Sequence, residues 1–217
     1  MILYCISGLG ADHRAFQYLK LQNTDLVHIP WLDDPAPGEA MADYAQRMIA
    51  GFDFSTDFYL LGLSFGGMIA QEIAKLHPPK KLFLLSTIES REELPIYFRV
   101  AGKLKLHQLV PNYVLQHPHP LSGLFWAFGA EGPEAKRLLE DFVKKTPAQY
   151  TKWAMQTVLN WHNDVHGAGI RIHGTNDRIL PVAADKVNYP IEGGGHMMVL
   201  DRAAEIGAFI NKELAEL

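Results

Sequence analysis

The chain is predicted to fold as an α/β protein with three layers, in which helices cover both faces of a mostly parallel sheet of about six strands. Two observations favour this class. Short apolar runs typical of strands alternate with stretches of helical periodicity up to residue 88 and again after residue 168. Turn residues also stand at the joints, because Pro35, Pro37 and Gly38 precede one helical stretch and Pro78 and Pro79 end the next.

The elements follow in order along the chain. The expected strands cover residues 1–6, 26–30, 57–62, 81–86, 169–173 and 187–191. The expected helices between and after them cover residues 11–20, 39–51, 65–77 and 201–216. Strands separated by helices favour parallel pairing, so the carboxyl ends of these strands are expected at one edge of the sheet.

Residues 89–167 interrupt the alternation with a stretch that has no strong strand pattern but many helix formers and aromatic residues. Helical spacing occurs in two groups: Ala135, Leu138, Leu139, Phe142 and Val143, and then Tyr150, Trp153, Ala154, Thr157, Val158 and Trp161. We therefore expect a core made of residues 1–88 and 168–217 and a helical insertion over residues 89–167.

Composition narrows the class of function. With 217 residues, 48% of them hydrophobic, the chain is long enough to bury a sizeable core. The net charge is −4 and no Lys/Arg run is present, so nucleic acid is not expected as a partner. The lone Cys5 excludes an intrachain disulfide, and neither a signal-peptide pattern nor an apolar run of membrane-spanning length is present. A cytoplasmic location is the expectation.

The most informative motif is Gly62-Leu63-Ser64-Phe65-Gly66, which joins an apolar strand to a helical stretch. A sharp strand-to-helix turn strains the backbone of its central serine, and flanking glycines relieve the crowding because they lack a Cβ. The hydroxyl of Ser64 is then expected to project into open space as a nucleophile. A structural alternative is a tight turn in which the serine only caps the helix.

Two further polar residues are expected at the same edge of the sheet. Asp177 follows the strand at 169–173, and His196 follows the strand at 187–191 after three glycines. A serine nucleophile needs a base and a group that orients the base, and this pair supplies both. Glu89 and Glu92 are the alternative acids.

An oxyanion hole is expected next to the serine. The first strand runs into Ser7-Gly8-Leu9-Gly10, a glycine-rich loop that opens a helical stretch. The backbone N–H groups of Leu9 and Phe65 are the candidate donors to an oxyanion.

Taken together, these motifs resemble the α/β-hydrolase fold superfamily, specifically a serine hydrolase with a helical cap. The order Ser64, Asp177, His196 is that of the superfamily, and Gly8-Leu9 is similar to its oxyanion loop. The resemblance implies that residues 89–167 form the cap. Ser7 stands where many members have His, and the usual leading strand pair is absent, which implies a reduced sheet of six strands.

The resemblance implies hydrolysis of an ester or thioester of a small to medium apolar acyl substrate through an acyl-enzyme, with no cofactor and no metal. His13, Trp126, Ile179 and Met197 are candidate substrate-binding residues. The spacing of His162, Asp164 and His166 permits metal binding on a helix, but no further ligands are near in sequence, so a metal site is not expected.

Two alternatives stay open at this stage. The same fold serves small-ligand binding proteins or receptors with little or no turnover, and the same triad serves amidases, carbon–carbon bond hydrolases and lyases. A dehalogenase is disfavoured because Ser64 stands where that chemistry uses an aspartate. The sequence does not indicate an oligomeric state.

Overall fold

In the computed structural model, which describes residues 1–32, 34–167 and 169–216, the six expected strands form one parallel sheet. The sheet order is β2-β1-β3-β4-β5-β6, and every neighbouring pair is parallel. The strands are β1 (Ile2–Ile6), β2 (Asp25–His28), β3 (Tyr59–Leu63), β4 (Leu82–Leu85), β5 (Ile170–Gly174) and β6 (Tyr189–Ile191). The predicted fold class is confirmed.

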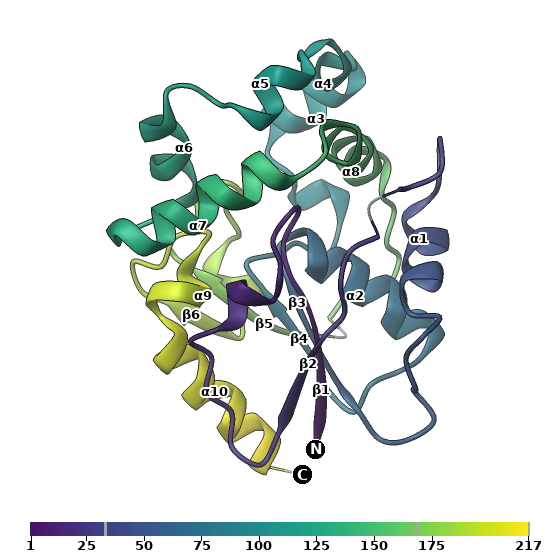
Figure 1. The fold of residues 1–217 in the computed structure, drawn as a ribbon. Coiled ribbons are helices and arrows are strands. Elements are labelled where there is room, and N and C mark those ends of the chain that lie inside the picture. The colour runs from purple at the N-terminus through teal and green to yellow at the C-terminus, as the bar shows by residue number, and fades with distance from the viewer. Residues whose placement is uncertain (33, 168, 217) are drawn as a thin grey trace.

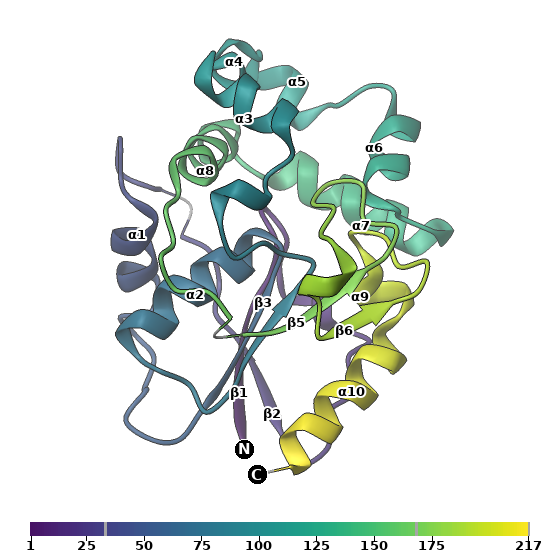
Figure 2. The ribbon, with the colours of Figure 1, turned by 180° about the vertical axis from the view of Figure 1, so that it is seen from behind.

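Helices cover both faces of the sheet (Figures 1 and 2). Helices α1 (Met41–Met48) and α2 (Phe65–Leu76) pack on one face, in a buried cluster that includes Tyr44 and Ile69. On the other face lie the 3₁₀ helix η1 (His13–Phe16), α9 (Met198–Asp201) and α10 (Ala203–Ala215), in a second cluster that includes Phe16 and Ile206. These two clusters give the three layers.

The prediction of a helix over residues 11–20 is wrong, because only the short 3₁₀ helix η1 forms there. Asp12 accepts from the backbone N–H of Arg14, and the bonds from Gln17 N to Arg14 O and from Leu19 N to Phe16 O have a spacing of three residues. Phe16 and Leu19 are both buried and are three residues apart, so burial favours this tighter winding over an α-helix.

Between β4 and β5 the chain is helical and lies across the carboxyl ends of the strands (Figure 1). After the 3₁₀ helix η2 (Arg91–Glu93), the helices are α3 (Ile96–Lys103), α4 (Leu106–Leu109), α5 (Asn112–Gln116), α6 (Leu121–Phe128), α7 (Gly132–Lys145) and α8 (Ala148–Asn160). A third 3₁₀ helix, η3 (Ala184–Lys186), precedes β6. The division into a core and a cap stays a prediction, and residues 33, 168 and 217 of the predicted core lie outside the described residues.

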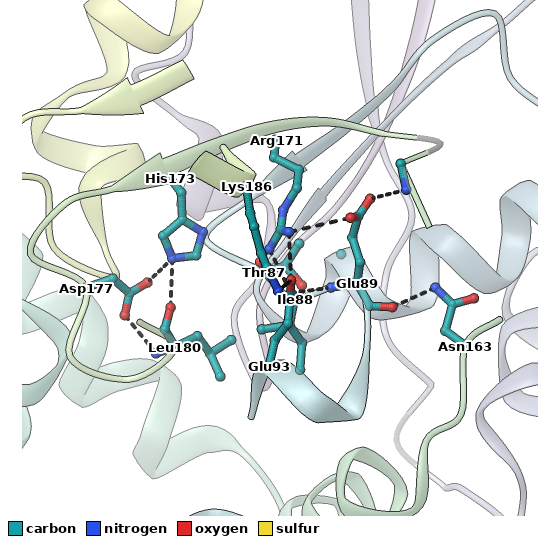
Figure 3. A network of polar contacts seen from close by, with 12 residues as sticks. Thr87, Ile88, Glu89, Glu93, Asn163, Arg171, His173, Asp177, Leu180 and Lys186 are labelled. Carbon is teal, nitrogen blue, oxygen red and sulfur yellow. Dashed lines mark hydrogen bonds and ion pairs between the residues drawn. The ribbon is translucent and has the colours of Figure 1, made fainter. Parts of the chain in front are cut away.

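A buried ion-pair network ties the start of this helical segment to the sheet (Figure 3). Arg171 of β5 lies 2.8 Å from the carboxylate of Glu93 and 3.4 Å from that of Glu89. Asn163 donates to the backbone carbonyl of Glu89 and to the side chain of Gln71 on α2. Burial alone would raise the pKa of Glu93, but Arg171 outweighs it and lowers that pKa. The network therefore joins β5, α2 and both ends of the helical segment.

No helix in the part of the chain that the structure describes combines the length and the apolar character needed to cross a bilayer.

The Arg171 network leads to a stability prediction. Replacing Arg171 by Met leaves the buried carboxylate of Glu89 without its cation and Glu93 with only Lys186 at 3.6 Å, so the free energy of unfolding should fall by about 3–5 kcal/mol. Urea denaturation followed by circular dichroism measures this loss. The matched control is Lys80→Met, which removes an exposed ammonium paired with the exposed carboxylate of Asp57 and should change stability far less. Equal losses of unfolding free energy in both variants would contradict a stabilising role for the buried ion pairs of Arg171.

Candidate active site

Ser64 stands at the turn between β3 and α2 with a strained backbone. Its φ of 54° and ψ of −122° lie outside the regions that non-glycine residues favour. Two hydrogen bonds hold this conformation. Ser64 N donates to Leu85 O at 2.8 Å, and the hydroxyl of Thr87 donates to Ser64 O at 2.6 Å. The side chain of Ser64 is therefore presented by a turn that β4 and the residues after it clamp in place.

Gly62 and Gly66 are required by the close packing of this turn. A Cβ on Gly66 would overlap the backbone carbonyls of Ile6 and Ser7, and a Cβ on Gly62 would overlap the backbone of Gly66 and Gly67. The end of β1 thus lies directly against the first turn of α2. This packing also brings the loop after β1 beside the serine, since Gly8 approaches Ser64 Cβ closely.

The structure brings Ser64, His196 and Asp177 together in one hydrogen-bonded chain. Ser64 Oγ lies 2.8 Å from His196 Nε2, and His196 Nδ1 lies 2.8 Å from Asp177 Oδ2. A carboxylate only accepts, so Nδ1 carries the proton and Nε2 is left to accept from the serine hydroxyl. In this arrangement the imidazole is ready to take the proton of Ser64.

Asp177 is almost fully buried and its carboxylate receives four N–H groups. Its Oδ1 accepts from the backbone of Ile179 and of Leu180, each at 2.9 Å. Burial alone would raise the pKa of Asp177, but the imidazoles of His196 and His173 outweigh it and hold that pKa below its usual range. The carboxylate is therefore ionised and orients the His196 ring.

His173 is a site residue that the sequence analysis did not single out. It belongs to β5, and its Nε2 lies 2.8 Å from Leu180 O and 3.3 Å from Asp177 Oδ2 (Figure 3). Both partners only accept, so Nε2 is the protonated nitrogen. Nδ1 is buried without a hydrogen-bond partner among the described residues. The signal that could have found it was a histidine near the end of this strand, four residues before Asp177.

The loop after β1 is held by a second cluster that the sequence analysis missed. The Ser7 hydroxyl donates to Ala11 O at 2.6 Å. Its oxygen then accepts from Trp31 Nε1 at 3.2 Å and faces His28 Nε2 at 3.1 Å. Trp31 Nε1 also donates to Gly8 O at 3.1 Å, so Ser7 and Trp31 fix the loop that contains Leu9.

Trp31 also links this loop to the start of α2. Its ring stacks on that of Phe65, with centroids 5.3 Å apart. Trp31 thus joins the loop that contains Leu9 to the helix that begins at Phe65. The N–H groups of these two residues are the candidate oxyanion donors. Their role as donors stays a prediction.

The helical segment contacts the loop that presents His196. Phe128 O accepts from Met197 N at 3.0 Å, and the Phe128 ring meets the His196 ring edge-on at 5.5 Å between centroids. A Cβ on Gly129 would overlap Gly195, so the two backbones touch. The position of His196 therefore depends on the end of α6.

The four candidate substrate-binding residues lie in different surroundings. His13 is exposed on η1 with its ring 6.2 Å from that of His28, and Trp126 is exposed on α6 beneath the guanidinium of Arg178. Ile179 is partly buried against the α2-side cluster. Met197 is buried on the α10 side, next to His196. Their roles in binding stay predictions.

The alternative acids lie in other surroundings. Glu89 pairs with Arg171, whereas Glu92 is exposed on η2. Asp177 is the acid that contacts His196. Among the described residues, no group of three or more His, Cys, Asp or Glu side chains is arranged to hold a metal ion. Burial raises the pKa of the Cys5 thiol, which is free, so this thiol stays protonated.

Comparisons with known proteins agree with this fold. The model of the alpha/beta hydrolase family matches residues 3–209. A candidate lipase from Acinetobacter baumannii AYE is 17% identical with a TM-score of 0.76, over 99% of this chain and 83% of its own. A thermophilic esterase from Thermogutta terrifontis is 14% identical with a TM-score of 0.70, over 100% of this chain and 90% of its own.

An esterase from Exiguobacterium antarcticum is 16% identical with a TM-score of 0.69, over 99% of this chain and 92% of its own. No curated protein matches the chain in sequence. At these identities the solved structures show a shared fold.

The paired imidazoles at Asp177 lead to a prediction about its ionisation. Replacing His173 by Phe removes one N–H donor from the carboxylate, so the pKa of Asp177 should rise. A depressed carboxyl pKa adds stability above the unfolded-state pKa of about 3.9, and that stability is lost as the pH falls through the folded-state pKa. The stability that the Asp177 carboxylate contributes at pH 7, relative to a pH below its folded-state pKa, should therefore be smaller in the variant.

Carboxyl-carbon NMR titration measures this pKa directly, with Asp177→Asn to assign the signal. His173→Gln is the matched control, because its amide keeps an N–H donor. An Asp177 that titrates identically in wild type and His173→Phe would show that His173 does not act on the carboxylate.

Proposed function

Because the chain belongs to the alpha/beta hydrolase family, we propose that it is a serine hydrolase that cleaves an ester or thioester of a small to medium apolar acyl group. The proposal rests on the hydrogen-bonded chain of Ser64, His196 and Asp177, in which Ser64 has a strained backbone. Fold alone would not give this function, since one fold serves many reactions.

The proposed reaction has two steps. His196 takes the proton of Ser64 as Oγ attacks the carbonyl carbon, and the acyl group becomes bound to Oγ. His196 then gives the proton to the leaving alcohol or thiol. In the second step His196 activates a water molecule, which releases the acid and restores Ser64. Asp177 remains ionised throughout and stabilises the imidazolium that forms in each step.

The oxyanion of each tetrahedral intermediate is proposed to bind the N–H groups of Leu9 and Phe65. Phe65 is the first residue of α2, so its N–H has no acceptor within the helix. The helix start also carries a partial positive charge that favours an anion. Loss of one such donor in another serine hydrolase costs about 3–4 kcal/mol of transition-state stabilisation.

A cavity beside this loop supports a small to medium acyl group. Its volume is about 240 Å³, and its wall combines Ala11, Trp31 and Tyr150 with the polar side chains of Asp12, His28 and Lys145. This is slightly below the roughly 300–1,000 Å³ of most small-molecule sites. Trp31 belongs to the cavity wall and also contacts Gly8 and Phe65, so one side chain links the cavity to the proposed oxyanion donors. We propose that it receives the acyl group.

The activated serine predicts covalent labelling. A fluorophosphonate probe should label wild type at Ser64, and Ser64→Ala should abolish the label, as read by intact-mass spectrometry. Ser55→Ala, at an exposed serine, should label like wild type. Absence of label on folded wild-type protein would overturn the hydrolase and leave the small-ligand binding protein as the better interpretation.

The cavity predicts a dependence on acyl length. Ala11→Leu should narrow it, so kcat/KM for p-nitrophenyl hexanoate should fall at least tenfold while that for p-nitrophenyl acetate changes little. Ala36→Leu, at an exposed alanine, is the matched control and should leave the whole ester profile unchanged. A uniform loss across all acyl lengths would place the acyl group elsewhere.

A further inference from the structure

An exposed apolar surface covers the outer end of the helical segment, apart from the Ser64 site. Among the described residues, every large apolar side chain that is more than half exposed lies between residues 96 and 126. These side chains are Ile96, Tyr97, Leu104, Leu109, Tyr113 and Trp126. The first five belong to α3–α5 and the connections between them, and we call them the apolar cap surface. Such a concentration marks an interaction site on a protein of this kind.

The helices beneath this surface do not use it to build a core. No residue of α3 or α5, both of which the structure describes in full, is buried. Helices α3, α4 and α5 each contact α8 with their inner sides. Ile96 and Val100 are four residues apart on one side of α3, Leu104 directly follows the helix, and all three are exposed. This apolar side faces outward.

The charge within the segment that carries the apolar cap surface has one sign. Residues 94–130 contain no Asp or Glu, but they include Arg99, Lys103 and Lys105. Lys103 and Lys105 are exposed next to Leu104. Lys152 of α8 adds a further cation, since its ammonium donates to Gln108 O of α4 at 3.5 Å. The surface therefore combines aromatic and aliphatic side chains with lysines, and the neighbouring acids Glu92 and Glu140 belong to η2 and α7.

We propose that the apolar cap surface docks on an anionic lipid bilayer. Aromatic and aliphatic side chains enter the headgroup boundary while lysines contact anionic headgroups, which is the pattern of proteins that lie on a membrane. The shape agrees, because α3–α5 protrude at the end of the molecule opposite to the two chain termini (Figures 1 and 2).

A second copy of the chain fits this surface less well. A symmetric dimer would place the surface against itself, and Lys103 and Lys105 of both copies would then face like charges. The apolar cap surface contains none of the residues of the Ser64 site, so the docking proposal does not depend on the serine chemistry.

Co-sedimentation with vesicles tests the proposal. Wild-type protein should bind vesicles of equal parts phosphatidylglycerol and phosphatidylcholine at least tenfold more tightly than vesicles of phosphatidylcholine alone. Raising the salt from about 0.1 M to about 1 M shortens the Debye length from ~10 Å to ~3 Å, so binding should weaken several-fold. Leu104→Ser with Leu109→Ser, and separately Lys103→Glu with Lys105→Glu, should each weaken it about tenfold or more.

Matched controls change the same residue types elsewhere. Leu76→Ser, and Lys20→Glu with Lys212→Glu, alter exposed residues of other elements and should bind like wild type. Failure of wild type to sediment with the anionic vesicles would overturn the proposal, whatever the variants do. So would a wild-type dimer, seen by sedimentation velocity, that the Leu104/Leu109 variant dissociates, because a second copy would then cover the surface.

Discussion

The site is organised around the buried carboxylate of Asp177. A charge removed from water is costly unless N–H groups replace the lost hydration, and here four of them do so. Two come from the turn that follows Asp177, one from His173 within β5, and one from His196 after β6. Satisfying this one charge therefore fixes the turn after β5, the tautomer of two histidines and the direction in which His196 faces Ser64.

The helical segment completes this framework because it contacts each of the loops that build the site. Phe128 bonds to Met197 beside His196, and the backbone carbonyl of Trp126 accepts from Arg178 beside Asp177. At the loop after β1, Thr146 packs against Gly10, and Arg14 pairs with Asp141 of α7. Residues far apart in the chain thus hold the three loops in fixed positions relative to one another.

The sequence was sufficient for the features that depend on local pattern. The alternation of strands and helices predicted all six strands, and the turn chemistry around Ser64, Asp177 and His196 predicted which side chains would meet. It was insufficient where burial decided the outcome. The 3₁₀ winding at residues 13–16 follows from the packing of Phe16 and Leu19, which no helical pattern reveals. The contacts of Ser7 with Trp31 and of Arg171 with Glu93 join residues 24 and 78 positions apart, so no local motif contains them.

The six-stranded sheet has two outer strands, β2 and β6, and their free sides must not pair with strands of other chains. Both are short, with β2 at four residues and β6 at three. Pro190 stands in the middle of β6, where it offers no N–H, and β2 begins at the exposed charge of Asp25. Short edge strands with a proline or a charge discourage the edge-to-edge pairing that leads to aggregation. This six-stranded sheet can therefore end in solvent at both outer strands without becoming a template for fibres.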